Sequence, residues 1–268
     1  MLKDITLGQY FPGNSIAHKL DPRTKILLVT LYIIALFSAK GWMGYAVMAV
    51  TLAACVKVSH VGLRALVRGL KPLVFIIAFT GILNMFFTPD THYLWEWGIL
   101  RVSVKGIENA LFMVIRIMLL VMGTFLMTYT TSPIRLTDGL ESLLNPLKKI
   151  HVPVHELAMM MAIALRFIPT LIEETDKIMS AQKARGADFE SGGLFQKAKA
   201  LVPILVPLFI SAFRRADELA TAMECRCYQG GEGRTKMKQL HYQRNDFAAF
   251  GAAALLTAAV IILKKFGM

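Results

Sequence analysis

The sequence predicts an all-α integral membrane protein with about five transmembrane helices, in a range of four to six, and additional long cytoplasmic helices. Hydrophobic residues make up 55% of its 268 residues and charged residues only 18%, whereas charged residues are about a quarter of a typical soluble domain. The mean hydropathy is +0.52. Apolar runs approach or reach the roughly twenty residues that a spanning helix needs, and they recur along the chain.

The clearest candidate spans are Ile107–Tyr129 and Phe247–Leu263, and Pro72–Phe87 is slightly short but strongly apolar. The stretch Ile26–Val56 carries Lys40 near its centre. We expect two short spans joined by a tight turn there, because a lysine can extend its ammonium group to the membrane surface. One tilted span with an interfacial helix is the alternative.

The distribution of lysine and arginine predicts the orientation. If the N-terminus is cytoplasmic, twenty-four of the thirty basic residues lie inside and five lie outside, while Arg116 lies within a span. This bias agrees with the positive-inside rule. We therefore expect a multi-pass protein of the cell membrane with a cytoplasmic N-terminus. The net charge of +12 is then explained by the orientation of the chain in the membrane and by contact with anionic lipid. No nucleic-acid binding is predicted.

The chain divides into three predicted regions: N-terminal membrane helices in 1–130, a cytoplasmic region in 131–246 and a C-terminal transmembrane helix in 247–268. Within the cytoplasmic region, Ser132 and Pro133 suit the start of a short helix. A helix over 155–185 follows, about 46 Å long, bent at its internal proline and ended by a glycine. A second unit repeats the design, with an apolar, proline-containing start and an amphipathic continuation.

Both long helices end in an arginine between small residues. The triplets are Ala184, Arg185 and Gly186, then Cys225, Arg226 and Cys227. A cation in the last helical turn gains about 0.3–1 kcal/mol from the helix dipole, so capping alone can explain one such arginine. Two on a repeated scaffold favour docking to a partner, since small neighbours allow close approach and a guanidinium can bond bidentately. Both interpretations stay open.

At this point the chain resembles the transmembrane subunit of energy-coupling factor (ECF) transporters, the EcfT/CbiQ-like family. The resemblance rests on "LDPRTKILL", "RFIPTLIEETDKIMSAQKARG", "VPLFISAFRRADELATAME" and the two arginine triplets, and it covers essentially the whole chain. It implies a non-enzymatic coupling subunit that binds no cofactor itself. Two ABC-type ATPases use the ATP, and a separate membrane S subunit captures a vitamin or metal ion.

The resemblance also assigns roles to the long helices. Region 131–246 would hold two coupling helices, and each arginine triplet would dock on one ATPase. The family usually has alanine and glycine around both arginines, whereas the second triplet here has Cys225 and Cys227. Cysteine accepts a positive φ less readily than glycine. We therefore expect the second helix to end differently from the first, or to turn later, at Gly230.

Three further features of the sequence predict a role. Arg116 lies about eleven residues into a span, and such buried charges are costly and often functional. A structural or coupling role is favoured over substrate binding, with Glu108 or backbone carbonyls as partners, and extension of the side chain to the membrane surface is the remaining alternative. Met159, Met160 and Met161 could form an adaptable surface for S subunits, or simply pack. The segment Asp21–Thr24 has the character of a turn and helix start, with a structural role in the bundle.

The sequence lacks the phosphate-binding pattern GxxxxGK[ST], so ATP binding by that route is not predicted. His151 and His155 are four apart, but Pro153 between them argues against a helical metal site, and no metal is predicted. A self-sufficient carrier is the main alternative function, and it would need polar residues converging at mid-membrane. A membrane-embedded enzyme is a weaker alternative.

Overall fold

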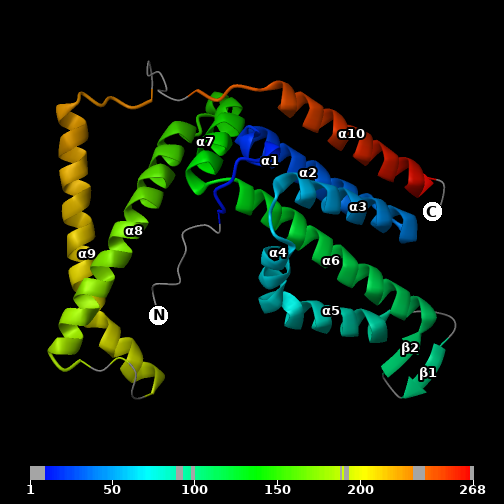
Figure 1. Ribbon diagram of the computed structural model, residues 1–268. Coiled ribbons are helices and arrows are strands. Elements are labelled where there is room, and N and C mark those ends of the chain that lie inside the picture. Colours follow the sequence, from blue (N-terminus) through cyan, green and yellow to red (C-terminus); the bar gives the residue numbers. More distant parts are fainter. Residues whose placement is uncertain are drawn as a thin grey trace. The chain divides into compact units, whose positions relative to one another are not determined.

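The protein is described by a computed structural model covering residues 10–88, 93–97, 100–187, 189, 193–231 and 239–265 (Figure 1). The elements in chain order are α1 Ile16–Lys19, α2 Pro22–Ser38, α3 Gly41–Ser59, α4 Leu63–Leu70, η2 Lys71–Leu73, α5 Val74–Phe87, β1 Tyr93–Trp97, β2 Leu100–Ser103, α6 Val104–Thr130, α7 Pro133–Leu144, η3 Asn145–Ile150, α8 Val154–Ala184, α9 Leu194–Cys225 and α10 Arg244–Lys265.

The chain forms two compact units. The bundle unit comprises Gly8–Gly139 and Leu240–Met268, and so contains α1 to α6, the start of α7 and α10. The hairpin unit comprises Met1–Leu7 and Leu140–Gln239, and so contains the end of α7 together with α8 and α9. The chain therefore leaves the bundle unit within α7 and returns to it just before α10.

Among the described residues, five helical segments are long and apolar enough to cross a membrane, which confirms the predicted all-α membrane class. They are Gly41–Ser59, Leu63–Phe87, Val104–Thr130, Val154–Ala184 and Arg244–Lys265. The number agrees with the prediction, but the set differs. Helix α2 has only 17 residues and is absent from the set. Helix α8, expected in the cytoplasmic region, has the length and composition of a span because its first half is apolar.

The predicted tight turn at Lys40 is confirmed. Helix α2 ends at Ser38 and α3 begins at Gly41, so only Ala39 and Lys40 separate them. Gly41 has φ +66, a left-handed conformation that glycine adopts at little cost. The two helices are therefore separate elements, and of the two only α3 is among the segments long and apolar enough to cross a membrane. The predicted pair of short spans and the alternative of one span with an interfacial helix both stay open.

The core of the bundle unit lies where α2, α3, α6 and α10 meet. Leu36, Met48, Leu119 and Val260, one from each of these helices, belong to a single buried cluster. Helices α2 and α6 approach closely because Gly123 has no side chain. Small residues at helix interfaces permit such contact, the usual basis of packing between membrane helices.

The sequence did not predict the antiparallel hairpin of β1 and β2, which precedes α6 (Figure 1). The hairpin lies between the predicted spans Pro72–Phe87 and Ile107–Tyr129, and residues 89–92 and 98–99 of this connection lie outside the described residues. The side chain of Ser103, the last hairpin residue, accepts a hydrogen bond from the Gly106 N–H at 2.9 Å. This N-cap joins the hairpin to the start of α6.

Candidate docking site at two arginine helix ends

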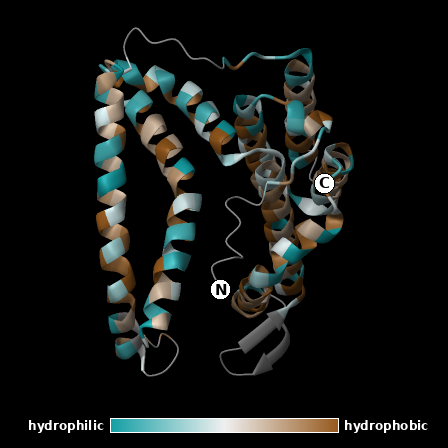
Figure 2. Ribbon diagram, turned by 60° about the vertical axis from the view of Figure 1, so that its left-hand side comes forward, coloured by the Kyte–Doolittle hydropathy of each residue, from teal (hydrophilic) through white to brown (hydrophobic). Residues whose placement is uncertain are grey.

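Helices α8 and α9 lie antiparallel in the hairpin unit. The Glu174 carboxylate of α8 accepts hydrogen bonds from the Ser211 hydroxyl and, at 3.1 Å, from the Arg215 guanidinium of α9. Further along α8, the Gln182 amide donates to the Pro203 carbonyl at 3.4 Å, earlier in α9. Later residues of α8 therefore contact earlier residues of α9, as expected for antiparallel helices. Hydrophilic and hydrophobic residues are intermixed along both helices (Figure 2).

Helix α8 ends in a Schellman turn around Arg185. The Gly186 N–H donates to the Lys183 carbonyl at 3.0 Å, and the Ala187 N–H donates to the Gln182 carbonyl at 3.0 Å. Gly186 has φ +88. This pair of bonds satisfies two of the carbonyls that a helix end leaves without partners. Backbone hydrogen bonds alone thus end the helix, and the Arg185 side chain takes no part in the turn.

Helix α9 ends in the same turn around Arg226. The Cys227 N–H donates to the Glu224 carbonyl at 2.8 Å, and the Tyr228 N–H donates to the Met223 carbonyl at 3.1 Å. These bonds occupy the same positions relative to Arg226 as those at the first helix end do relative to Arg185. The two arginines are therefore equivalent residues of two equivalent turns.

The expectation that the second helix would end differently is wrong. Cys227 adopts φ +55 in the position that Gly186 holds in α8. Gly230 also has a positive φ, +95, but it lies beyond the turn and does not start it. A left-handed conformation costs a residue with a side chain roughly 1–2 kcal/mol. The two carbonyl hydrogen bonds of the turn offset this cost.

All six triplet residues are exposed. Within the described part of the chain, neither the Arg185 nor the Arg226 guanidinium has a hydrogen bond or ion pair. The side chains therefore do not cap their own helices by bonding the last carbonyls. If these arginines stabilise their own helices, they do so only through the attraction between their positive charge and the helix dipole. Both guanidinium groups keep their donors available for a partner.

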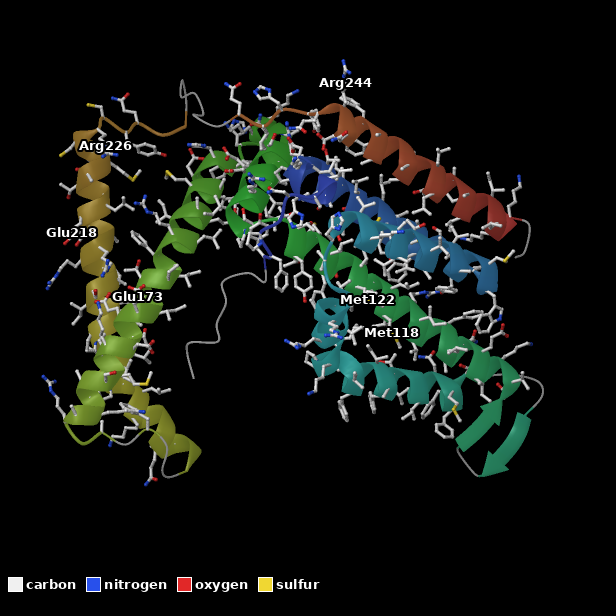
Figure 3. All side chains as sticks on the ribbon, in the orientation of Figure 1. Met118, Met122, Glu173, Glu218, Arg226 and Arg244 are labelled. Atoms are coloured by element: carbon white, nitrogen blue, oxygen red, sulfur yellow. The ribbon has the colours of Figure 1, made fainter. Side chains whose placement is uncertain are left out.

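The two arginines lie at opposite ends of the α8–α9 pair. Arg185 follows Glu174 by eleven residues and Arg226 follows Arg215 by eleven, in antiparallel directions. At about 1.5 Å per residue, this places the two turns on the order of 30 Å apart along the pair. Figure 3 shows Arg226 at the end of α9, with Glu218 before it on the same helix. Such separation suits two docking points rather than one shared site.

Arg116 serves the interior of the bundle unit. Its Nε donates to the Tyr45 hydroxyl at 2.8 Å, and its guanidinium lies 5.7 Å from the ring centres of Phe37 and Tyr45. The contact thus joins α6 to α3 and α2, and Tyr45 takes the place of the predicted Glu108 partner. A guanidinium over aromatic faces gains cation–π attraction. The geometry favours the structural role.

The methionine run lies on α8. Met160 and Met161 are 54% and 39% exposed, and neighbouring Leu157 is 44% exposed, whereas Met159 is half-buried. Two of the three methionines thus lie outside the chain's own core. This exposure suits a surface that another protein or lipid covers, and the adaptable surface for S subunits stays a prediction.

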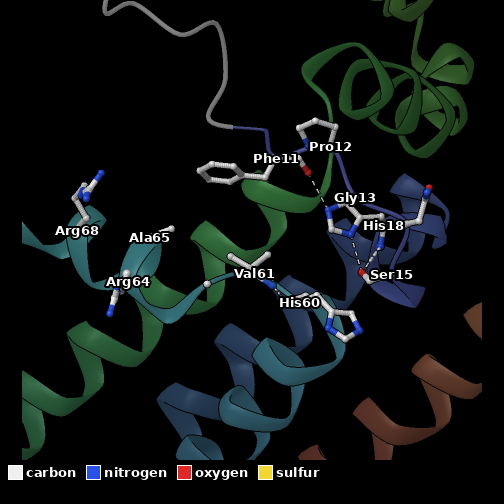
Figure 4. A pocket seen from close by; sticks show the side chains of 13 residues that line it. Phe11, Pro12, Gly13, Ser15, His18, His60, Val61, Arg64, Ala65 and Arg68 are labelled. Carbon is white, nitrogen blue, oxygen red and sulfur yellow. Dashed lines mark hydrogen bonds between the residues drawn. The ribbon is translucent and has the colours of Figure 1, made fainter.

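A cavity of about 760 Å³ lies between the N-terminal loop and the α3–α4 turn (Figure 4). His18 lies in its wall, and both ring nitrogens are in use: Nδ1 bonds the Ser15 hydroxyl at 2.6 Å and Nε2 bonds the Phe11 carbonyl at 3.0 Å. His18 therefore holds the loop in place. None of the site residues predicted from the sequence lines this cavity.

Known proteins are similar in sequence to this chain over nearly its full length. A family model described as cobalt transport protein, CbiQ, matches residues 13–237. Proteins named energy-coupling factor transporter transmembrane protein EcfT are similar to it. That of Ruminiclostridium cellulolyticum is 53% identical over 264 residues, 98% of both chains. That of Thermosediminibacter oceani is 56% identical over 261 residues, 97% of this chain and 98% of its own.

A more distant relative, EcfT of Bacillus subtilis, is 46% identical over 264 residues, 98% of this chain and 100% of its own. The matches extend over both units and include both arginine turns. Taken with the five span-like helices, this similarity establishes that the chain belongs to the CbiQ/EcfT family, the transmembrane components of energy-coupling factor transporters.

Proposed function

We propose that this chain is the non-catalytic coupling subunit of its transporter. In this role α8 and α9 receive the movement of two ABC-type ATPases and pass it to a separate membrane S subunit that captures a vitamin or metal ion. The observation that carries the proposal is the pair of equivalent, exposed arginine turns at opposite ends of one antiparallel helix pair.

The chemistry of each turn suits docking to a protein groove. The guanidinium can make bidentate bonds to a carboxylate or bond carbonyl oxygens of the partner. The triplet residues beside it are small, so the helix end can approach a surface closely. Because the Schellman bonds fix the backbone, little backbone conformational entropy is lost on binding. Two separated turns match two ATPases better than one.

Exposed apolar side chains on the same helices support contact with a second membrane protein. On α9, Phe209 and Phe213 are 65% and 56% exposed, and their ring centres lie 4.6 Å apart. On α8, Met160 and Met161 add flexible, polarisable side chains. Exposed apolar surface of this kind marks contact with protein or lipid. The S subunit, rather than this chain, selects the substrate in our proposal.

The test is co-purification of the chain with its ATPases after the changes Arg185→Ala, Arg226→Ala and both together. ATP-driven uptake is measured in parallel, with tritiated riboflavin as the probe and an S subunit that binds it. Arg214→Ala is the matched control, because Arg214 is an exposed arginine on α9 outside the turn. We expect each single change to weaken assembly, and the double change to abolish assembly and uptake, while the control retains both.

Normal assembly and uptake in the double variant would reduce both arginines to residues of a helix end. A loss equal to that of the control would show that general positive charge, rather than the two turns, is responsible. The membrane fraction of each variant is compared first, so that a folding defect is recognised.

A further inference from the structure

The first turn of α2 is held by a network of buried and half-buried charged groups. The Asp21 carboxylate caps the helix by accepting the Arg23 N–H at 2.9 Å, and it also accepts the Arg23 side chain at 3.0 and 3.1 Å. Asp21 is only 6% exposed. Its carboxylate therefore fixes both the backbone of this turn and the direction of the Arg23 guanidinium.

On one side, this turn holds the segment by which the chain returns from the hairpin unit. The Arg23 guanidinium donates to the Leu240 carbonyl at 3.0 Å and lies 4.1 Å from the centre of the Tyr242 ring. Asp246, which is fully buried, accepts the Asp21 N–H at 2.9 Å. Leu240 is the first residue of the returning segment. The first turn of α2 thus contacts the returning segment and the start of α10 at three residues.

On the other side, the turn holds the segment by which the chain leaves the bundle unit. The Lys25 ammonium donates to the Thr130 carbonyl at 2.8 Å and to the Thr131 hydroxyl at 3.1 Å. These residues end α6 and lead into α7, and a cation there is favoured by the α6 dipole. Lys25 precedes the apolar run of α2, and burial lowers its pKa to about 8.

The start of α7 lies against the same turn. A side-chain carbon placed on Gly139 would come within 3.0 Å of Pro22 and 3.3 Å of the Arg23 nitrogen. Gly139 is the last residue of the bundle unit before the chain enters the hairpin unit. Hence the two chain crossings that flank α8 and α9, one after Gly139 and one before Leu240, are both bound to the first turn of α2.

We propose that Asp21, Arg23 and Lys25, the α2 anchor, pass movement of the coupling helices to the membrane helices. The inference rests on the proposed coupling function. Force applied to α8 and α9 can pass along the chain to the bundle unit through the two crossings that flank these helices. The anchor binds both crossings to one rigid helix start, so they move α2 together instead of bending independently. These are positioning residues, remote from both arginine turns in sequence.

The test uses the whole complex with its ATPases and S subunit, reconstituted in liposomes. Lys25→Met removes the bonds to the outgoing segment, and Asp246→Asn weakens the carboxylate that accepts from α2. Lys25→Arg retains donors and is the conservative variant, and Arg64→Met changes an exposed arginine on α4 as a control. Assembly, ATP hydrolysis and uptake of tritiated riboflavin are measured for each.

We expect Lys25→Met and Asp246→Asn to retain assembly and ATP hydrolysis while uptake per ATP falls about tenfold or more, within the range typical of coupling between sites. Lys25→Arg should regain most of the uptake, and the control should match the unchanged protein. Unchanged uptake per ATP in both variants would overturn the proposal. So would a parallel loss of assembly, hydrolysis and uptake in both, because that outcome shows a purely structural role.

The two proposals fail in different ways. If the arginine turns do not dock ATPases, Arg185→Ala and Arg226→Ala leave assembly intact, whatever the anchor variants do. If only the anchor proposal is wrong, the arginine variants still lose assembly while the anchor variants keep their uptake per ATP.

Discussion

Cys227 occupies the same left-handed position after α9 that Gly186 occupies after α8, with φ values of +55 and +88. The hydrogen bonds around the two residues match one for one. Cys227 therefore holds a conformation that favours glycine, and the shape of the turn is kept where the usual residue is absent. The equivalence of the two turns follows from the backbone rather than from identical sequence.

Replacing Cys227 by glycine is expected to stabilise the protein. Glycine adopts a positive φ without the clash of a side chain, which is worth roughly 1–2 kcal/mol. Thermal unfolding of the purified protein in detergent measures the change. Gly186→Ala is the reciprocal variant and should destabilise by a similar amount. A decrease in stability for Cys227→Gly would contradict the assigned turn.

Ala184→Leu is expected to weaken assembly with the ATPases while leaving the subunit folded. Leucine forms helices nearly as well as alanine, so α8 should persist. The added bulk lies beside Arg185 and keeps the helix end from approaching a groove closely. Pull-down of the ATPases measures the effect, and Ala181→Leu, an exposed position one turn earlier, is the control. Equal binding by both variants would argue against close docking at the triplet.

Gly123→Ala is expected to destabilise the bundle unit by about 1–3 kcal/mol, the usual cost of overpacking. The added carbon would lie 2.5 Å from the Tyr32 ring, which is held by the bond from its hydroxyl to the Leu119 carbonyl. Gly251→Ala is the matched control in α10, because its added carbon meets no neighbour within 4 Å. That change should be neutral or stabilising, since alanine favours helix by up to about 1 kcal/mol over glycine. Unfolding curves that rank the two variants the other way would refute this packing.

Tyr45→Phe is expected to cost about 1–3 kcal/mol, because the Arg116 Nε–H loses its acceptor in a half-buried site. Arg116→Met removes the other partner. If the bond links α3 to α6, the double variant should be less unstable than the two single effects predict together. Unfolding of all three variants measures this coupling, and strict additivity would show that the two side chains do not interact energetically.

The sequence predicted the helical elements well because their signals are local. Apolar length marked α6 and α10 to within a few residues, Pro133 marked the start of α7, and Lys40 marked the α2–α3 turn. It predicted the two arginine triplets as the ends of α8 and α9. The prediction from residue type was wrong at Cys227. There the hydrogen bonds of the turn offset the cost of a positive φ for a residue with a side chain.

The contacts that the sequence did not predict join residues far apart in the chain. The Asp21–Asp246 hydrogen bond spans 225 positions, and the Lys25–Thr130 bond spans 105. The available signal was weak: an aspartate directly before the apolar run of α10, and charged residues directly before that of α2. Such charges also suit a membrane surface, so pairing between them could not be inferred without the fold.

Protection of the native cysteines beside Arg226 tests the central claim most directly. In inside-out membrane vesicles of a Cys55→Ala variant, the exposed Cys225 and Cys227 are labelled with a membrane-impermeant maleimide, with and without the ATPases. Arg214→Cys, in a variant lacking the other cysteines, reports on α9 outside the turn. Docking of the α9 turn predicts that assembly shields Cys225 and Cys227 while position 214 stays reactive. Equal labelling of Cys225 and Cys227 in free and assembled protein would contradict it.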